Sequence, residues 1–349
     1  MSKMGLGAAI GVVFLIAGCV AAPGYQGPKS DHFDGNVFRN TLPAEKGFWD
    51  LVRMGWGSVV DAQDWPGDVP NGNFPAPADD VVDDIVVTYV NHSTVLVQVA
   101  GVNILTDPVY SERVSPFTWA GPKRVRAPGI ALEELPHIDV ILISHNHYDH
   151  LDAKTLQDIS AQQSQPPLIL AGLGNTAFFA QLGLEETRDM DWDDQIEHAG
   201  LSFHFVECRH RSGRGITDQM KTLWGSFVIE TPQGNIYFGG DTGYSPHFKA
   251  QGARFEEFAL TILPIGAYEP RWFMADIHLN PADAVQAHLD LNSRQSLGIH
   301  FGVFQLTYEG IDQPALDLSR ALDQAELSQS TFWVLEPGMS RTIAQTLSR

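Results

Sequence analysis

From Ile85 onward, short apolar runs alternate with segments in which apolar residues recur every three to four positions. Uninterrupted or alternating runs rich in Val, Ile and Leu predict strands, whereas the helical spacing predicts amphipathic helices. Ala100-Gly101 lies between two such runs and predicts a tight hairpin turn. The predicted strands are 85–90, 94–99, 102–105, 140–143, 168–171, 203–206, 222–229, 236–238, 260–264, 296–299 and 331–335. The predicted helices are 151–159, 175–182, 281–289 and 314–327.

The order of these elements predicts the fold class. Strands and helices are mixed along the chain, which favours an α/β (α+β) fold of two sheets sandwiched between helix layers. The run 140–143 is short, mostly β-branched and uninterrupted, as is typical of a strand covered on both faces. Asn280 and Pro281 favour a helix that begins at 281, because Asn caps helices and Pro suits the first turn. We therefore expect one large domain over residues 81–349.

The amino-terminal end shows a different pattern. Gly5 to Ala17 is apolar but too short to span a bilayer comfortably. Ile16-Ala17-Gly18-Cys19 resembles a bacterial lipobox, so we expect residues 1–18 to be a lipoprotein signal peptide and Cys19 to carry the lipid. An ordinary secretory signal or an uncleaved anchor is the alternative. Val20, a residue other than Asp after the Cys, resembles the pattern sent to the outer membrane, so we expect a tethered protein in the bacterial cell envelope that faces the periplasm.

Residues 19–80 are interpreted as an extension or linker. Residues 48–56 have the pattern of a short amphipathic helix, which would pack on the main domain or touch lipid or substrate. Residues 61–80 contain Pro66, Pro70, Pro75 and Pro77 among Gly and Asp, and they predict an irregular connection.

Composition narrows the possible partners. The 349 residues are 44% hydrophobic, which is enough for a large core. Acidic residues outnumber basic ones by 42 to 22, giving a formal net charge of −20. Because such a surface repels polyphosphate backbones, nucleic acid is excluded as the expected partner. The only cysteine besides Cys19 is Cys208, for which we expect a buried, inert thiol. No pattern sets an oligomeric state.

A cluster of metal-ligand side chains follows the buried run 140–143. The segment Ser144-His145-Asn146-His147-Tyr148-Asp149-His150 has three histidines and one carboxylate within six residues. Neutral imidazoles and ionised carboxylates bind divalent metals such as zinc, and iron or manganese is also compatible. His210, Asp241 and His300 also lie at or just past the ends of predicted strands. The pattern therefore predicts one metal site built from distant parts of the chain.

These residues carry a family resemblance. His145-Asn146-His147-Tyr148-Asp149-His150 matches the HxHxDH signature of the metallo-β-lactamase fold, an αββα sandwich. Longer segments between Ile85 and Arg341 resemble the N-acyl-phosphatidylethanolamine-hydrolysing phospholipase D family. They include Asn91-His92-Ser93-Thr94-Val95-Leu96-Val97, Gly239-Gly240-Asp241-Thr242-Gly243-Tyr244 and Pro264-Ile265-Gly266-Ala267-Tyr268-Glu269-Pro270-Arg271-Trp272-Phe273-Met274, with His278 beyond.

The resemblance implies two zinc ions held by seven residues. One ion would be held by His145, His147, His210 and Asp241. The other would be held by Asp149, His150, Asp241 and His300, so that Asp241 bridges the pair.

The implied reaction is hydrolysis of a phospholipid. Two metals about 3.5–4 Å apart lower the pKa of a shared water, and they stabilise charge on the phosphoryl oxygens. The hydroxide would attack phosphorus, yielding phosphatidic acid and an N-acylethanolamine. The implied catalytic residues are Asp149, Asp241 and His278, with Asp149 expected to act as a ligand rather than as a free base.

Further residues receive an expected role next to the metals. The resemblance places Tyr148 and His278 as substrate contacts, with core packing as the alternative for Tyr148 and a satisfied hydrogen bond as the alternative for His278. His92 and Asp107 are expected to support the metal ligands. Arg271 would either bind phosphate or form a structural ion pair.

Two other functions remain open from the sequence. The first is a lactonase or phosphodiesterase that uses the same metals on a small soluble substrate. The second is a non-catalytic envelope lipoprotein that uses metal for stability; a seven-ligand set argues against it, because structural zinc sites are closed, four-coordinate and rich in Cys.

Overall fold

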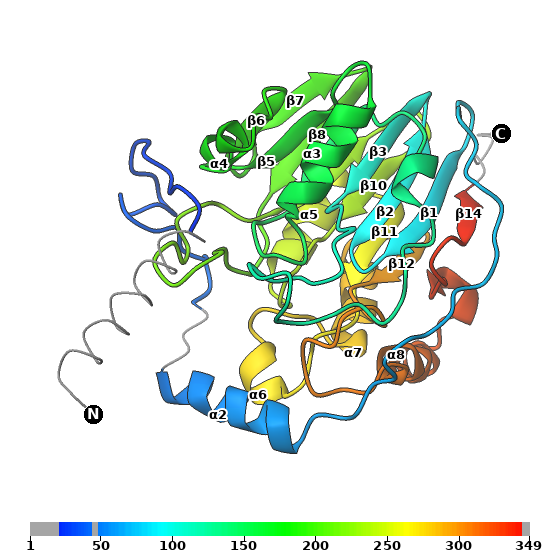
Figure 1. Ribbon diagram of the computed structural model, residues 1–349. Coiled ribbons are helices and arrows are strands. Elements are labelled where there is room, and N and C mark those ends of the chain that lie inside the picture. Colours follow the sequence, from blue (N-terminus) through cyan, green and yellow to red (C-terminus); the bar gives the residue numbers. More distant parts are fainter. Residues whose placement is uncertain (1–20, 44–47, 344–349) are drawn as a thin grey trace.

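Two seven-stranded sheets pack face to face between layers of helices in the computed structural model, which describes residues 21–43 and 48–343 (Figure 1). The first sheet has the strand order β14-β1-β2-β3-β4-β5-β6, and the second has the order β13-β12-β11-β10-β9-β8-β7. The strands of the first sheet are β1 (Ile85–Asn91), β2 (Thr94–Val99), β3 (Val102–Thr106), β4 (Val140–Ile143), β5 (Leu168–Gly172), β6 (Thr187–Met190) and β14 (Ser340–Ile343). Those of the second are β7 (Gln195–His198), β8 (Leu201–Val206), β9 (Ser226–Glu230), β10 (Asn235–Phe238), β11 (Phe258–Pro264), β12 (Ser296–Ile299) and β13 (Phe332–Trp333).

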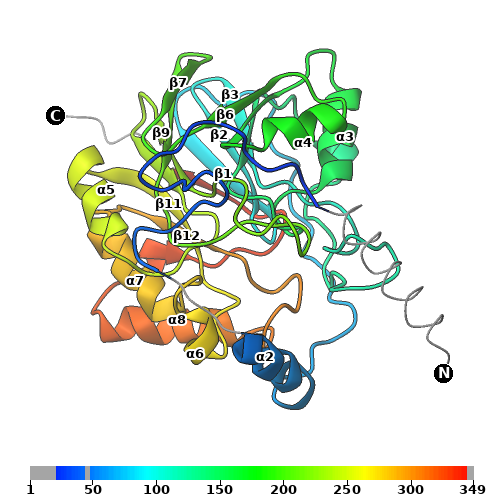
Figure 2. The same ribbon diagram turned by 90° about the vertical axis from the view of Figure 1, so that its left-hand side faces the viewer.

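Seven α-helices surround the sheets among the described residues. They are α2 (Phe48–Val60), α3 (Ala153–Gln162), α4 (Thr176–Gln181), α5 (His247–Phe255), α6 (Arg271–Met274), α7 (Pro281–Asp290) and α8 (Gln313–Gln324). Seen from the side, α5, α7 and α8 lie against the second sheet, while α3 and α4 lie against the first (Figure 2). This arrangement is the αββα sandwich that the sequence predicts.

Three buried clusters form the interfaces between the layers. Between the sheets, Val140 and Leu142 of β4 join residues of β8 and β10. On the other face of β4, Ile141 and Ile143 pack with Leu156 of α3. A third cluster joins the second sheet to α5, α7 and α8. Both faces of β4 are therefore covered, which explains its uninterrupted apolar sequence; burying each such side chain contributes about 1.5–3 kcal/mol.

The predicted strands and helices mostly match the observed ones. Asn280 caps α7 as expected, because its side chain accepts a hydrogen bond from the Asp283 backbone in a capping box. The predicted strand 222–229 is wrong at its start, since β9 begins at Ser226. Before it, the backbone amides of Leu223 and Gly225 donate to Leu173 and Ser144 rather than to a neighbouring strand of the same sheet. The predicted strand 331–335 reduces to the two residues of β13.

Three strands and two helices, α5 and α6, have no counterpart in the sequence prediction. β6, β7 and β14 are edge strands whose side chains are largely polar and exposed, so they show no apolar run. The helix α5 contains Gly252 and has only a weak apolar spacing in its sequence.

The amino-terminal segment 21–43 packs against the sandwich. Phe33 and Phe38 belong to the cluster between the sheets, and the Phe38 amide donates to the Met220 carbonyl at 2.8 Å. Residues 61–80 are irregular, as expected. The predicted signal peptide and Cys19 lie outside the described residues. Among the residues that the structure does describe, no helix is both long and apolar enough to cross a bilayer.

Candidate metal centre

Four strand ends bring the predicted metal ligands to one edge of the sandwich. β4 leads directly into the loop from His145 to His150, β10 ends shortly before Asp241, and β12 ends at the residue before His300. His210 follows β8. All seven side chains predicted from the sequence converge here. They are His145, His147, Asp149, His150, His210, Asp241 and His300.

A glycine allows loops from the two sheets to approach each other. Gly240 has a φ of +56°, and a Cβ there would lie 2.3 Å from the Cβ of Ser144. Since real Cβ atoms do not approach so closely, any side chain at position 240 would push Asp241 away from the loop that carries His145.

The first half of the centre consists of His145, His147, His210 and Asp241. The Nδ1 atom of His147 lies 2.8 Å from Nε2 of His145 and 3.4 Å from Nε2 of His210. Oδ2 of Asp241 lies 4.0 Å from Nε2 of His145 and 3.7 Å from Nε2 of His210. The four donor atoms therefore surround one point.

The second half consists of Asp149, His150, His300 and the same Asp241. Nε2 of His300 lies 3.3 Å from Oδ2 of Asp149 and 3.3 Å from Oδ1 of Asp241. Nε2 of His150 lies 3.5 Å from Oδ2 of Asp149 and 3.2 Å from Oδ2 of Asp241. Asp241 thus belongs to both halves.

These spacings fit divalent metal ions. Donors at about 2.0–2.2 Å from a tetrahedral ion stand about 3.3–3.6 Å apart, and the distances between donors scatter around that value in both halves. Nε2 of His150 and Oδ1 of Asp241 are buried and have no hydrogen-bond partner. Because buried polar atoms are normally paired, a cation between these atoms accounts for both.

The two halves differ in their electrostatics. Burial lowers the pKa of His145 and His147 well below the usual range and that of His210 to about 4, so these three imidazoles are neutral. In the second half, burial opposes protonation, but Asp241 and Asp149 outweigh it and raise the pKa of His300 to about 9. The pKa of His150 is raised well above its usual value for the same reason. Without metal, protons therefore balance part of the carboxylate charge in the second half.

Hydrogen bonds behind the ligands fix their orientation. Nδ1 of His150 donates to Oδ2 of Asp107 at 2.6 Å, which leaves Nε2 for a metal. The hydroxyl of Ser144 donates to the same carboxylate oxygen at 2.6 Å. Nδ1 of His210 donates to the Ile277 carbonyl at 2.9 Å. Such partners set the ring tautomer and raise ligand affinity.

Three positions around the centre have left-handed backbones. The φ angles are +44° at His92, +31° at Asp107 and +63° at His300. Non-glycine residues in this region cost about 1–3 kcal/mol each and concentrate at functional sites. The His300 amide also donates to the His92 carbonyl, and Nε2 of His92 donates to Oδ2 of Asp149 at 3.2 Å. The structure thus places His92 and Asp107 in contact with the ligands, as the sequence predicts.

Asn40 supports the centre although no sequence pattern predicts it. Its side-chain amide donates to the His210 carbonyl at 2.8 Å, and its Oδ1 accepts from the His210 amide at 3.2 Å. The Trp224 indole donates to the same oxygen at 3.1 Å. Asn40 therefore ties the amino-terminal segment to a metal ligand 170 positions later. No local sequence pattern predicts a contact between two residues so far apart in the chain.

Arg214 was also missed, and it buttresses the metal-binding loop. Its guanidinium donates to the carbonyls of Asn146 and Leu151 at 3.0 and 2.7 Å. It also lies 4.0 Å from the centre of the Tyr148 ring, which packs beside a cluster containing Phe304. The Tyr148 ring is thus packed against other side chains, which fits the packing alternative. A contact between Tyr148 and the substrate stays a prediction.

The remaining predicted residues are also placed. Nε2 of His278 lies 3.7 Å from Oδ2 of Asp241, and its Nδ1 is buried without a hydrogen-bond partner, so the ring belongs to the centre. Arg271 forms an ion pair with Asp283 at 2.7 Å and donates to the His278 carbonyl. Of the two roles expected for Arg271, the structure therefore fits the structural ion pair rather than phosphate binding. Cys208 is buried, and burial raises the pKa of its thiol, as expected of an inert side chain.

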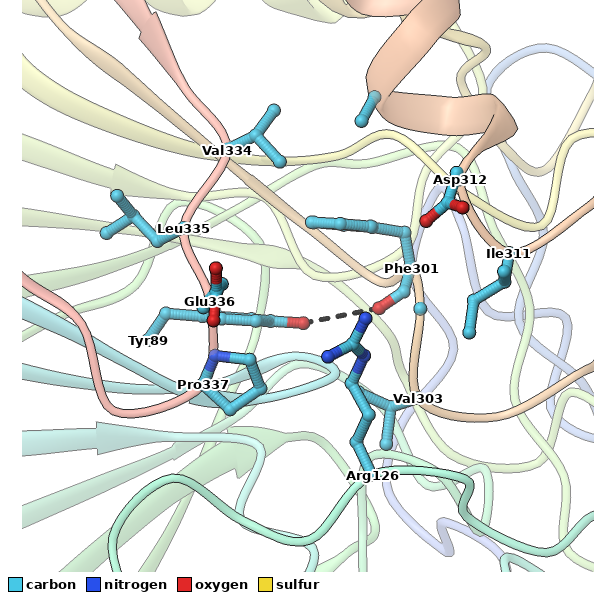
Figure 3. A pocket seen from close by; sticks show the side chains of 12 residues that line it. Tyr89, Arg126, Phe301, Val303, Ile311, Asp312, Val334, Leu335, Glu336 and Pro337 are labelled. Atoms are coloured by element: carbon cyan, nitrogen blue, oxygen red, sulfur yellow. Dashed lines mark hydrogen bonds between the residues drawn. The ribbon is translucent and has the colours of Figure 1, made fainter. Parts of the chain in front are cut away.

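A pocket of about 260 Å³ lies next to residues 301–303, which directly follow His300 (Figure 3). Phe301 and Gly302, the two residues after His300, form part of its wall. The Tyr89 hydroxyl donates to the Phe301 carbonyl at 3.3 Å, and Arg126 projects toward the same carbonyl. None of the seven candidate ligands lines it, so the pocket is separate from the candidate metal centre.

Comparisons with known proteins agree with this geometry. Residues 102–301 match the family described as the beta-lactamase superfamily domain. The chain is 39% identical to an uncharacterised protein of Mycobacterium tuberculosis over 259 residues, 73% of this chain and 68% of that protein. It is 35% identical to the N-acyl-phosphatidylethanolamine-hydrolyzing phospholipase D 1 of Caenorhabditis elegans over 262 residues, 72% of this chain and 74% of that protein. Among solved structures, a possible metal-dependent hydrolase of Veillonella parvula shares the fold, with a TM-score of 0.59 and 14% identity over 75% of this chain and 99% of that one.

Proposed function

The chain belongs to the β-lactamase superfamily and has the fold of its metal-dependent hydrolases, and we propose that it is a zinc-dependent phospholipase D-type phosphodiesterase. The proposed substrate is N-acyl-phosphatidylethanolamine. The observation that carries the proposal is the convergence of seven ligands in two halves that share Asp241. A relative named for this substrate, similar over most of its length, supports the choice.

The bound zinc ions would supply a water of lowered pKa and positive charge opposite the phosphoryl oxygens. Asp241, whose carboxylate lies near the ligands of both halves, would help to hold both ions. Asp149 would serve as a ligand, since its Oδ2 lies 3.5 Å from Nε2 of His150 and 3.3 Å from Nε2 of His300, which is the spacing of donors around one ion.

His278 is proposed to contact the substrate. Its ring centre lies 5.2 Å from that of His210 and 5.3 Å from that of His300, so it faces both halves. Burial lowers the pKa of His278 well below its usual value, which leaves a neutral imidazole. A neutral ring beside the metals can hydrogen-bond a phosphoryl or amide oxygen without repelling the cations.

The overall reaction consumes one water per substrate. The bond between phosphorus and the ethanolamine oxygen breaks, and the oxygen of water joins phosphorus. The ethanolamine oxygen takes a proton and leaves as N-acylethanolamine, while phosphatidic acid remains. Substrate would be reached at a membrane surface, where we propose that a lipid on Cys19 tethers the protein in the bacterial envelope.

The test is lipid-product analysis by mass spectrometry. Purified zinc-loaded protein would be assayed against N-acyl-phosphatidylethanolamine in mixed micelles, a lactone panel and bis(4-nitrophenyl) phosphate. We expect equal amounts of phosphatidic acid and N-acylethanolamine, which chelation abolishes and zinc restores. Activity confined to lactones or to the soluble diester would overturn the phospholipase proposal.

A further inference from the structure

All eight tryptophans lie in the part of the chain that the structure describes, and four of them are exposed. Trp49 is 77% exposed, Trp56 74%, Trp119 77% and Trp272 38%. Because a tryptophan carries more apolar surface than any other side chain, a group of exposed ones indicates a contact surface.

Trp49, Trp56 and Trp272 lie on two neighbouring helices that pack with a residue in contact with a metal ligand. Trp49 and Trp56 belong to α2, which packs through Met54 on a cluster that includes Ile277. The carbonyl of Ile277 accepts the hydrogen bond from His210. Figures 1 and 2 both place α2 beside α6, which carries Trp272, and the Arg53 guanidinium lies 4.1 Å from the centre of the Trp272 ring.

Trp119 lies in a loop that starts and ends at the same edge. The loop leaves β3 just before Asp107, whose carboxylate orients His150. It returns through an isolated bridge between Arg124 and Phe304, shortly after His300. We call Trp49, Trp56, Trp119 and Trp272 the tryptophan rim.

The helix α2 turns an apolar stripe toward solvent. At 100° per residue, Trp49, Trp56 and Val60 fall within about 40° of one another around the helix axis. Val60 is 61% exposed. On a surface helix of a soluble protein the apolar stripe normally faces the core, but α2 carries this solvent-facing stripe in addition to the side through which Met54 packs.

We propose that the tryptophan rim docks the metal-bearing edge on the surface of a zwitterionic phospholipid bilayer. Tryptophan is the side chain most typical of the membrane–water interface, where its ring is in contact with lipid and its N–H stays wet. The choice of phospholipid rests on the proposed function, because the rim borders the site that would receive a phospholipid headgroup.

The net charge of the protein favours a zwitterionic bilayer over an anionic one. The chain carries a formal net charge of −20, so an anionic surface repels it. Within α2, Asp50 and Arg53 cancel, and the stripe itself has no charge. The lipid proposed on Cys19 would anchor the protein in the same membrane.

The test measures vesicle binding by flotation. The full-length chain with Cys19→Ser, which cannot be lipidated, would be mixed with vesicles of equal phosphatidylcholine and phosphatidylethanolamine. We expect the added pair Trp49→Ala and Trp56→Ala to weaken partitioning about tenfold. Leu289→Ala, at the far end of α7 and 47% exposed, is the matched control and should bind as the parent does.

A second readout separates docking from folding and from the proposed function. The ratio of activity on vesicle-borne N-acyl-phosphatidylethanolamine to activity on bis(4-nitrophenyl) phosphate should fall about tenfold in the pair variant, with an unchanged melting temperature. If the pair variant does not fold, Trp119→Ala alone should lower both the binding and this ratio. If the parent binds vesicles but hydrolyses no lipid, the proposed function fails while docking stands. Unchanged flotation of the folded variants, or loss only of self-association in sedimentation, would overturn the proposal.

Discussion

The two halves of the metal centre share Asp241 but are built differently. The first half uses three neutral imidazoles, and one of them is held by backbone contacts and by Asn40 from the amino-terminal segment. The second half uses two carboxylates and two imidazoles, with the buried carboxylate of Asp107 behind His150. Because negative charge favours both protons and cations, the second half should bind metal more tightly but in competition with protons. This difference predicts that a substitution behind one half lowers the metal affinity of that half and leaves the other half unchanged.

Removal of the shared ligand should have the largest effect. Asp241→Asn takes one negative charge from both halves, so we expect metal content to fall in each and turnover to fall by a factor of about 10²–10³ or more. Atomic emission and product analysis measure the two quantities. Asp158→Asn, on the exposed side of α3, is the control and should match wild type. Wild-type turnover in Asp241→Asn would contradict the bridge.

The next substitution should affect the second half. Asp107→Asn keeps the size of a buried side chain but weakens the partner of His150, so we expect metal affinity there to fall about 10–100-fold. Metal titration should then show one tight ion and one weak ion. Equal weakening of both ions would contradict the division into halves.

The corresponding substitution for the first half is Asn40→Ala. It removes both hydrogen bonds to the His210 backbone, and we expect the affinity of the first half to fall about tenfold. Asn36→Ala changes an exposed residue of the same segment and is the control for a general loss of packing between residues 21–43 and the sandwich. A lower melting temperature with unchanged metal affinity would mean that Asn40 stabilises the fold only.

The smallest expected effect is the pH dependence of the stability of the metal-free protein. In the metal-free protein the pKa of His300 is about 9, above its unfolded value, so its contribution to stability is complete below about pH 6.5 and lost as pH rises through 9. The melting temperature of the chelated protein should therefore fall over this window, and zinc should remove the slope. Calorimetry at pH 7 in two buffers should show protons released by the second half only. Equal release from both halves would contradict the electrostatic contrast.

The sequence predicts the ligands of both halves, but it predicts the residue behind the second half better than the residue behind the first. Asp149, His150 and His300 follow buried strands whose apolar runs are visible, and Asp107 lies beside a predicted strand. Asn40 and Arg214 act on distant backbone groups, and such contacts leave no periodicity in either segment. The same reason explains the missed edge strands β6, β7 and β14, whose pairing satisfies backbone groups without burying an apolar face. Patterns of burial are therefore visible in the sequence, whereas long-range contacts between polar side chains and the backbone are not.

The most direct test of the centre is anomalous diffraction from crystals of the full chain grown with zinc. Two peaks per chain should appear, one among His145, His147 and His210 and the other among Asp149, His150 and His300, with one oxygen of Asp241 toward each. A single peak, or zinc bound elsewhere with these seven side chains uncoordinated, would contradict the account.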